Sequence, residues 1–464
     1  MKTQIDRMAD YVTRKKWEDM SPEILAQLKN HLLDSLASFV FSQTQETPQK
    51  VAASLQKLSN SLQLPADHAA QYYTTLIRYP DFMDNFLAKE ATCHPSDNIG
   101  ALLAACHLRE VSGKDFLLAM AIAYELECRL TEQLPVMING YDHTALLAFS
   151  ATAGIGKLLG LTADEMANAL AIAGCSYNPL VTSRASYTTE WKGLASSLVN
   201  NGAVNIAMMA REQVTGPRKL FELPEKGYNA IYGLKLEYDW EQENFDLIPR
   251  CILKTFNAEV HTQSALEAIQ ELTVAHNISP EKVKEIDITI FLTALHIVGN
   301  GEYGDRMHVY SKEQGDHSLP YVAAATLIDQ QLYPPQLTPA RIQRLDVQEL
   351  LKRVHCHTGL PIHKPVKVVG MLDPYTVAYP DKVCSKVKIT MNDSSHYTLE
   401  KEDYKGFFTR PLSTDEIKIK FEKMNADNTG AAYRQRLYQC IANLETRSAN
   451  ELLELLLSPD KTES

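Results

Sequence analysis

The sequence has no hydrophobic stretch long enough to cross a membrane. Its longest wholly apolar run covers residues 116–124, nine positions, whereas a membrane-spanning helix needs about 20. The first 17 residues mix charges throughout and lack the apolar core of an export signal. These two absences predict a cytoplasmic protein without a membrane partner.

Closely spaced cysteines are also missing. None of the eight forms a C-x-x-C pair, the spacing common in zinc and iron–sulfur sites. One cluster still resembles a metal site: His355-Cys356-His357 with His363, in which the first and third residues would share a strand face. Because the spacing fixes no fourth ligand type, we predict neither a metal nor any other cofactor.

An excess of positive charge is the third absence. The chain carries 46 Lys and Arg against 57 Asp and Glu, a net charge of −11. Non-specific binding of nucleic acid needs a basic surface, and no G-x-G-x-x-G or G-x-x-x-x-G-K-S/T loop follows a predicted strand. We therefore expect no nucleic-acid partner and no nucleotide site of these kinds.

What the sequence does contain is typical of a globular protein. It has 464 residues, of which 45% are hydrophobic and 22% charged. At about 150 residues per domain, this length favours two or three domains.

Helical patterns dominate the first 268 residues. Ser21 and Pro22 form an N-cap with proline at the first helical position, and apolar residues then recur every three or four positions up to Phe39. Residues 162–165 form a capping box. The Ala-rich segments between these signals are apolar on nearly all sides, as in buried helices. Residues 1–268 are therefore predicted to form an all-α helical domain.

A period-two pattern begins after Asn277. Apolar residues alternate with polar ones from Ile286 to Leu292 and again over 382–391, and Asn392-Asp393 then turns the chain into a predicted hairpin. With helices expected between these strands, residues 269–409 predict a smaller α+β domain.

A second capping box, at residues 413–416, starts the C-terminal helices. Residues 410–464 are expected to complete the first domain, because chain termini often lie close together. The predicted fold is mainly α: a large all-α helical domain plus a smaller α+β domain.

The segment from Asp81 to Asn98 has the most unusual composition. Three acids and a lysine precede His94, which Pro95 biases away from helical dihedrals. Ser96 or Asp97 would then cap the next helix, whose N-terminus favours an anion. The alternative is a helix-capping loop with solvated charges.

Two further short motifs contain titratable groups. Asp142 next to His143 can orient or charge the imidazole, although a turn and an N-cap would look the same. Lys192 is the one lysine of a weakly charged stretch. It would bind a carboxylate or act as a base if buried, or reach water with its amine if its stem alone packs.

Histidines also mark two later segments. Glu259, His261 and Gln263 would share one face of an extended segment. Asp316-His317 precedes Tyr321 at the opening of a predicted helix. Taken alone, each of these histidines is more often a satisfied boundary residue than a catalyst.

Together these segments resemble the MmgE/PrpD family, whose members include 2-methylcitrate dehydratase and cis-aconitate decarboxylase. The matching stretches follow family order over most of the chain: RYPDFMDNFLAKEATCHPSDN (78–98), GYDHT (140–144), KLLGLTADEMANALAIAG (157–174), EWKG (190–193), TGPRKLFE (215–222), LKTFNAEVHTQS (253–264) and DHSLPYVAAATLID (316–329). The resemblance implies the same two-domain fold and a homodimer. It also implies an active site in the cleft between the domains that binds a small carboxylate and needs no metal or iron–sulfur cluster.

The resemblance also implies roles for single residues. The family's functional positions fall on Asp84, His94, Lys192 and Tyr321, with His143 and His261 in loops where histidine placement varies. At Asn85 and at 88–90 this chain departs from cis-aconitate decarboxylase, which carries a Thr and further histidines there. The departure favours the dehydratase type.

The expected reaction is removal of water from a hydroxy di- or tricarboxylate such as 2-methylcitrate or citrate. A base takes the proton next to a carboxylate, an acid protonates the leaving hydroxyl, and cations neutralise the charge that builds up. We expect substrate binding by Arg78, Lys192, Lys254 and Tyr321. His94, His143 and His261 are the acid and base candidates, and Asp84 would orient one of them.

Three alternatives remain at this stage. An isomerase or epimerase of the same family would return the proton, a decarboxylase would release carbon dioxide, and a non-catalytic dimeric scaffold would only bind anions. Lys192→Ala is expected to abolish turnover and leave the fold intact.

Overall fold

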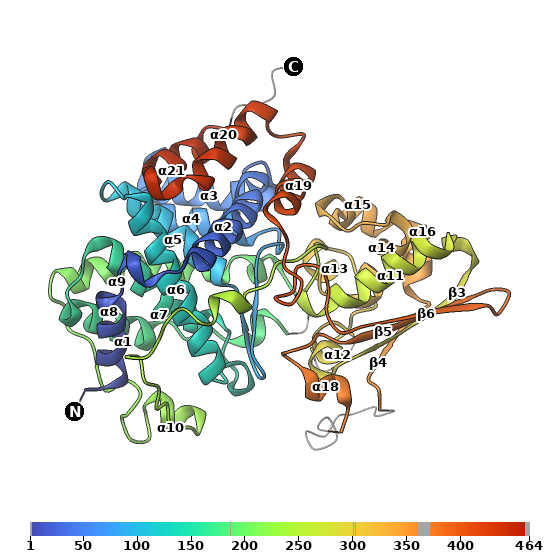
Figure 1. Ribbon diagram of the computed structural model, residues 1–464, viewed down its shortest axis with the longest axis horizontal. Helices are drawn as coiled ribbons and strands as arrows, with labels where there is room; N and C mark the ends of the chain where they lie inside the picture. The colour runs from blue at the N-terminus through green and yellow to red at the C-terminus, as the bar shows by residue number, and fades with distance from the viewer. Residues whose placement is uncertain (1, 186, 300, 302, 361–371, 460–464) are drawn as a thin grey trace. The chain divides into compact units, whose positions relative to one another are not determined.

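The computed structural model describes residues 2–185, 187–299, 301, 303–360 and 372–459. The chain forms two compact units. Unit 1 comprises Met1–Val181, Gly193–Cys251 and Ser413–Ser464, and unit 2 comprises Thr182–Lys192 and Ile252–Leu412 (Figure 1). The protein is mainly α with a smaller α+β part, which confirms the predicted fold class.

Unit 1 is built from helices around a buried centre. Helix α7 (Thr144–Leu159) is buried along nearly its whole length. Its one long polar residue, Lys157, donates to the carbonyls of Val12, Thr13 and Lys15 at the end of α1. The helices of this unit are α1 (Gln4–Arg14), α2 (Pro22–Ser42), α3 (Glu46–Ser59), α4 (Ala66–Arg78), α5 (Ile99–Ala104), α6 (Gly113–Gln133), α7, α8 (Ala163–Ser176), α9 (Ala195–Arg211), α10 (Tyr228–Tyr232), α19 (Thr414–Asn425), α20 (Ala431–Ala442) and α21 (Ala449–Leu457).

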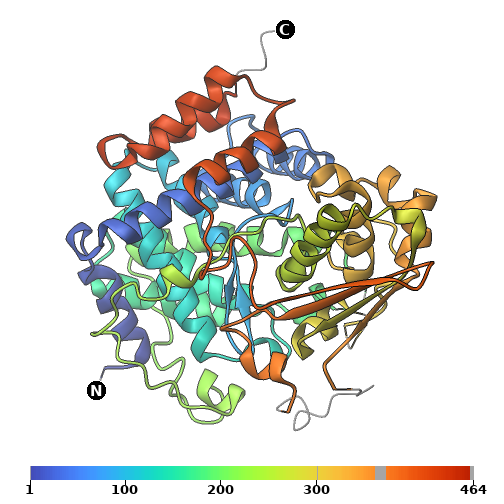
Figure 2. The same ribbon diagram turned by 45° about the vertical axis from the view of Figure 1, so that its right-hand side comes forward.

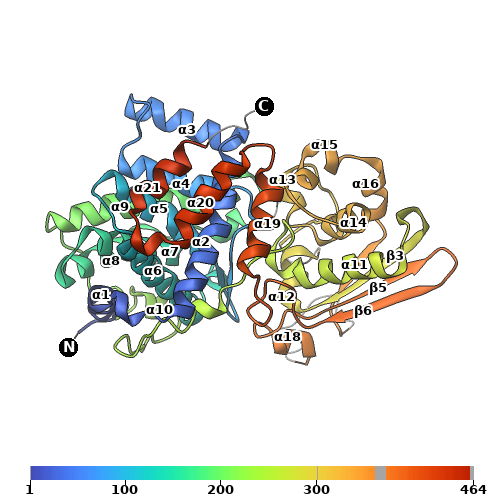
Figure 3. The same cartoon turned by 45° about the horizontal axis from the view of Figure 1, so that its top comes forward.

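Helices α19 and α20 of the C-terminal stretch pack against α2 near the start of the chain (Figure 3). The predicted cap at Ser21 is confirmed, since its side chain accepts from the N–H of Ile24. The capping boxes at Thr162 and Ser413 are confirmed as well. Each of these caps joins residues only three positions apart, so the local sequence suffices to specify it.

The predicted cap at Ser96 or Asp97 is wrong. A 3-10 turn, Pro95–Asn98, runs directly into α5, so the backbone is already helical where a cap residue would be extended. Helix α5 accordingly begins without a side-chain cap bond. It also lies close to α4, because a Cβ on Gly100 would come within 2.5 Å of the backbone nitrogen of Thr74.

Unit 2 contains a four-stranded sheet in the order β4-β3-β5-β6. Strand β3 (Val283–Ile290) pairs parallel to β4 (Val354–His357) and antiparallel to β5 (Ser385–Met391). Strands β5 and β6 (His396–Lys401) form the predicted hairpin (Figure 2). The alternation predicted for β3 is confirmed, although the strand ends at Ile290 and Leu292 already begins α12.

Helices α11, α14 and α16 lie on one side of this sheet, and α12 and α18 lie near the ends of its strands (Figure 1). Short helices α13 and α15 complete the unit. The bounds are α11 (Gln263–His276), α12 (Leu292–Val298), α13 (Lys312–Gly315), α14 (Leu319–Asp329), α15 (Pro339–Ile342), α16 (Leu345–Leu351) and α18 (Pro374–Ala378).

The long stretch of unit 2 begins at Ile252, whereas the sequence placed a boundary at residue 268. Backbone hydrogen bonds explain the early entry. The N–H groups of Leu253, Asn257 and Glu259 donate to carbonyls of Gly406, Leu332 and Asp316. Such long-range bonds leave no mark on local periodicity. None of the helices in the described part of the chain is long and apolar enough to cross a membrane.

Candidate active site

In unit 1 the predicted residues lie within a group that we call the unit 1 cluster. His94 is its clearest acid–base group. Its Nδ1 lies 2.9 Å from the main-chain oxygen of Asp84. A carbonyl oxygen can only accept, so Nδ1 carries the proton and a neutral His94 presents Nε2 as the basic atom. The cluster consists of Arg78, Asp81, Asp84, His94, Asp97, Asp142 and His143, all buried.

Asp84 is fully buried and doubly held. One carboxylate oxygen lies 2.9 Å from Nδ1 of His31 and the other accepts from the N–H of Ser96 at 2.9 Å. Burial alone would raise the pKa of Asp84, but His31 and the Ser96 N–H hold it below its usual range. Asp84 therefore orients His94 through its backbone, while its carboxylate pairs with His31, which the sequence did not single out.

His143 lies next to His94. The ring centroids are 5.1 Å apart in an edge-to-face arrangement. The carboxylate of Asp142 accepts from the N–H and hydroxyl of Thr144, which holds the start of α7 as the turn interpretation predicts. The same carboxylate is 3.8 Å from Nε2 of His143.

Arg78 is surrounded by acids. Its Nη1 lies 2.9 Å from Asp81 and its Nε 3.8 Å from Asp97. Burial alone would lower the pKa of this guanidinium, but the two carboxylates raise it. Its charge is thus balanced inside unit 1, and its predicted role in substrate binding stays a prediction.

Unit 2 holds Lys192 in a buried ion pair. The amine is 2.7 Å from Asp316 Oδ1 and 3.0 Å from Nδ1 of His317, and the residue is 1% exposed. The alternative in which this amine reaches water is wrong, because a carboxylate more than a hundred positions away meets it in the interior. Arg184 donates to the carbonyl of Lys192 at 2.6 Å, which fixes the short 3-10 turn Glu190–Gly193.

Asp316 is shared by several positive groups. Burial would raise its pKa, but Lys192, Lys312 and His317 hold it well below its usual range. Nδ1 of His317 lies 2.7 Å from the oxygen that Lys192 also contacts. Lys192, Asp316 and His317 therefore form one buried triad. The sequence showed Asp316 and His317 as titratable neighbours but did not select them.

His261 has a matching arrangement. Its Nδ1 is 2.7 Å from Glu259 Oε1, and its Nε2 is 3.0 Å from the hydroxyl of Tyr379. The predicted extended face over 259–263 is wrong: Glu259 caps a 3-10 turn, Val260–Thr262, that leads into α11. This turn brings the carboxylate of Glu259 into contact with the imidazole of His261, two positions later in the chain.

The two histidine–carboxylate pairs are joined through the backbone. The N–H of Glu259 donates to the carbonyl of Asp316 at 2.8 Å. Positive side chains act on both pairs: Lys254 on Glu259, Lys312 on Asp316, and Arg306 on both. Glu313, 4.0 Å from Lys312, and Asp305, near Arg306, add negative charge. This group, the unit 2 cluster, consists of Lys192, Lys254, Glu259, His261, Arg306, Lys312, Asp316 and His317.

Lys254 and Tyr321, both predicted to bind substrate, have different partners in the structure. Lys254 is buried. Burial alone would raise the pKa of Glu259, but His261, His317 and then Lys254 lower it. The Tyr321 hydroxyl donates to the main-chain oxygen of Gln336. Its predicted hydrogen bond to substrate stays a prediction, and it requires that this bond be exchanged.

The histidine-rich stretch at 355–357 forms strand β4. His355 and His357 are both exposed, and Nε2 of His357 is 3.0 Å from the hydroxyl of Thr289. His363, the fourth residue of that pattern, lies outside the described residues.

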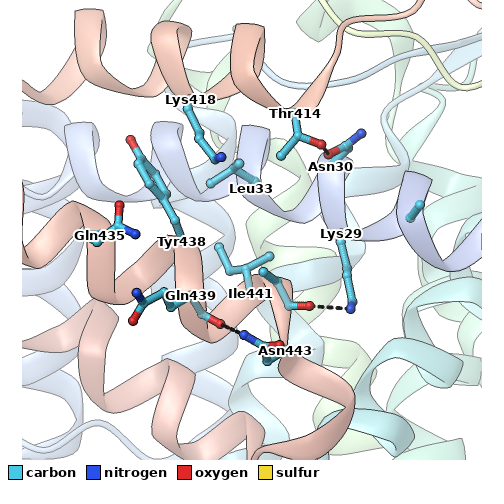
Figure 4. A pocket seen from close by; sticks show the side chains of 12 residues that line it. Lys29, Asn30, Leu33, Thr414, Lys418, Gln435, Tyr438, Gln439, Ile441 and Asn443 are labelled. Carbon is cyan, nitrogen blue, oxygen red and sulfur yellow. Dashed lines mark hydrogen bonds between the residues drawn. The ribbon is translucent and has the colours of Figure 1, made fainter.

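A pocket of about 350 Å³ lies between α2, α19 and α20 of unit 1 (Figure 4). Lysines, amides and Tyr438 line it above an apolar floor that includes Leu33 and Ile441. Its lining contains no histidine and no carboxylate.

Comparison with known proteins agrees with the motifs. The MmgE/PrpD N-terminal domain matches residues 6–241 and the C-terminal domain matches residues 256–446. Human cis-aconitate decarboxylase is 23% identical over 98% of this chain and 95% of its own length. The 2-methylcitrate dehydratase of Escherichia coli K12 is 25% identical over 63% of each chain, and that of Escherichia coli O157:H7 is 24% identical over 85% of this chain and 83% of its own.

The relatives named by these comparisons are enzymes of two kinds, dehydratases and decarboxylases. The resemblance inferred from the motifs is confirmed, because the matched domains together span most of the sequence. This chain belongs to the MmgE/PrpD family.

Proposed function

We propose that the protein is a cytoplasmic, homodimeric lyase that removes water from a hydroxy di- or tricarboxylate such as 2-methylcitrate or citrate. The proposal includes no metal and no other cofactor. The dehydratases among its relatives support it. The observation that carries it is the unit 2 cluster, in which buried lysines and carboxylates hold two oriented imidazoles.

The chemistry requires such a cluster. A proton next to a carboxylate is weakly acidic, and its removal places further negative charge on that carboxylate. Fixed cations in a dry site stabilise this charge, commonly the largest catalytic contribution. Lys192 and Lys254 are buried amines suited to this task.

The protein's net charge of −11 would repel a polyanion at long range. Salt limits this repulsion, because the Debye length is about 8 Å at physiological ionic strength. A locally positive cluster can therefore bind the substrate although the molecule as a whole is acidic.

His94, His143 and His261 are the proposed acid and base. The proton on Nδ1 of His94 is fixed by a carbonyl, which leaves Nε2 as a proton acceptor. Glu259 similarly favours the Nδ1 proton of His261, whose Nε2 faces the hydroxyl of Tyr379. Each positioned acid or base contributes about 10²–10⁴-fold to the rate.

A decarboxylase is the second candidate, since human cis-aconitate decarboxylase aligns over nearly the whole chain. Asn85 and the segment 88–90 favour the dehydratase. An isomerase or an anion-binding scaffold would use the same cations but release neither water nor carbon dioxide.

Product analysis separates these candidates. Purified protein is incubated with 2-methylcitrate, citrate and cis-aconitate, and products are followed by mass spectrometry and ultraviolet absorbance. Dehydration is expected to lower the substrate mass by one water and create an absorbing double bond. Loss of carbon dioxide from cis-aconitate would instead identify a decarboxylase, and deuterium exchange from D₂O without a mass loss would identify an isomerase. Light scattering tests the dimer against the 52.0 kDa chain.

A further inference from the structure

One lysine of the C-terminal helix α19 is buried against the segment that anchors His94. Lys420 is 3% exposed. Its amine lies 2.7 Å from Asp34 Oδ1, donates to the carbonyl of Phe82 at 2.7 Å, and stands 3.8 Å from the centroid of the Phe82 ring. All of these groups belong to unit 1.

The segment that Lys420 contacts has a tight conformation. Asp81 has a φ of 55°, in the left-handed region that few non-glycine residues adopt. Its side chain is held by Arg78 on one side, and the carbonyl of the next residue is held by Lys420 on the other. The surroundings thus maintain a backbone conformation that costs free energy by itself.

Two residues further on, the same segment holds His94 through the main-chain oxygen of Asp84. Helix α2 secures this arrangement twice. His31 binds the Asp84 carboxylate, and Asp34, one turn later on the same face, binds Lys420. A continuous set of buried contacts therefore runs from Lys420 to the imidazole of His94.

We propose that Lys420 is a positioning residue for His94. It fixes the Phe82–Asp84 backbone and thereby the orientation of the basic Nε2 atom. The inference rests on the proposed function for its effect on turnover, whereas its effect on the His94 ring is independent of the reaction.

The test must separate positioning from loss of folding. Lys420→Met alone leaves Asp34 buried without its cation, which is strongly destabilising. Lys420→Met/Asp34→Asn removes both charges and keeps the packing. Lys418→Met is the matched control, because Lys418 lies on the same helix at the pocket of Figure 4 and pairs with the largely exposed Asp415 at 2.9 Å.

Two measurements are made on each folded variant. The first is kcat and KM with the acid that the wild type converts. The double variant is expected to lower kcat about 10–100-fold, as small misplacements of catalytic groups do, with KM changed less than about twofold. Lys418→Met is expected to match the wild type.

The second measurement is the NMR spectrum of ¹³C-labelled histidine, with the His94 signal assigned by its loss in His94→Asn. The double variant is expected to shift or broaden that signal, and Lys418→Met to leave it unchanged. An unchanged His94 signal and unchanged kcat in the double variant would overturn the inference. If the wild type converts none of the acids, the proposed function fails, and the His94 signal still decides the role of Lys420.

Discussion

The clusters of the two units differ in which buried charge is surrounded by groups of the opposite charge. In the unit 1 cluster the guanidinium of Arg78 is enclosed by carboxylates, and the histidines are fixed by a carbonyl and by neighbouring acids. In unit 2 two carboxylates, Glu259 and Asp316, are enclosed by amines. The two clusters therefore differ in the sign of the buried charge that is surrounded: positive at Arg78 and negative at Glu259 and Asp316. In the reaction proposed above, His94 transfers a proton and the lysines of the unit 2 cluster stabilise the anion.

Loss of the central amine of unit 2 should have the largest effect. Lys192→Met is expected to lower kcat/KM at least about 10³-fold, because a fixed cation no longer meets the developing charge. The structure revises the expectation of an intact fold, since the buried Asp316 would lose its nearest amine and keep only Lys312 and His317 as partners, which is destabilising.

The double variant Lys192→Met/Asp316→Asn separates the two effects. Thermal unfolding is expected to show stability recovered relative to the single variant, with turnover still lost. Activity near the wild-type level in either variant would remove Lys192 from the mechanism.

His94→Asn tests the role of unit 1 in the same way. We expect kcat to fall about 10²–10³-fold with little change in KM, because a base is lost while the cations of unit 2 remain. The acidic limb of the pH–rate profile should change as well. His276→Asn serves as a control on α11, where the ring stacks on Tyr397. A loss of affinity instead of rate would place His94 among the binding groups.

Two cations give a direct contrast between the units. Lys254→Gln is expected to raise KM about tenfold by weakening anion binding. Arg78→Lys is expected to leave KM unchanged but to lower the melting temperature, because lysine cannot reproduce a guanidinium placed between Asp81 and Asp97. Steady-state kinetics and thermal unfolding of both variants decide this, and a raised KM in Arg78→Lys would restore its predicted role in substrate binding.

Sequence predicted the parts of this molecule that are encoded locally. The caps at Ser21, Thr162 and Ser413 and the alternation of β3 each depend on residues a few positions apart. The cap at Ser96 failed because a 3-10 turn precedes the helix, a choice between two local geometries that the composition does not decide.

The partners of the site residues could not be predicted in this way. His31 meets Asp84 across 53 positions, Lys192 meets Asp316 across 124, and Lys420 meets Phe82 across 338. Only the tertiary fold brings such pairs together. The one available signal was chemical: charged or imidazole side chains at positions that an apolar pattern predicts to be buried, as for His31 within the stripe of α2.

The smallest expected effect concerns the stability of unit 1 and its buried acid Glu127. Glu127 on α6 is fully buried, accepts from the Asn98 amide at 2.6 Å, and lies near Asp97 and Cys93. Burial, followed by the charges nearby, raises its pKa well above the usual range, so the folded protein keeps it protonated where the unfolded chain does not.

The stabilising effect of that proton is complete below the unfolded pKa, about 4.5. It is lost progressively as the pH rises toward the folded value. Glu127→Gln keeps the hydrogen bond without the proton uptake. It should stabilise the protein by about 1 kcal/mol at pH 7, and the gain should disappear near pH 4.5. Denaturant unfolding across this range, with Glu132→Gln as an exposed control on the same helix, measures it. A gain that is constant with pH would show that Glu127 is not protonated in the folded state, and that unit 1 tolerates a buried negative charge close to Asp97.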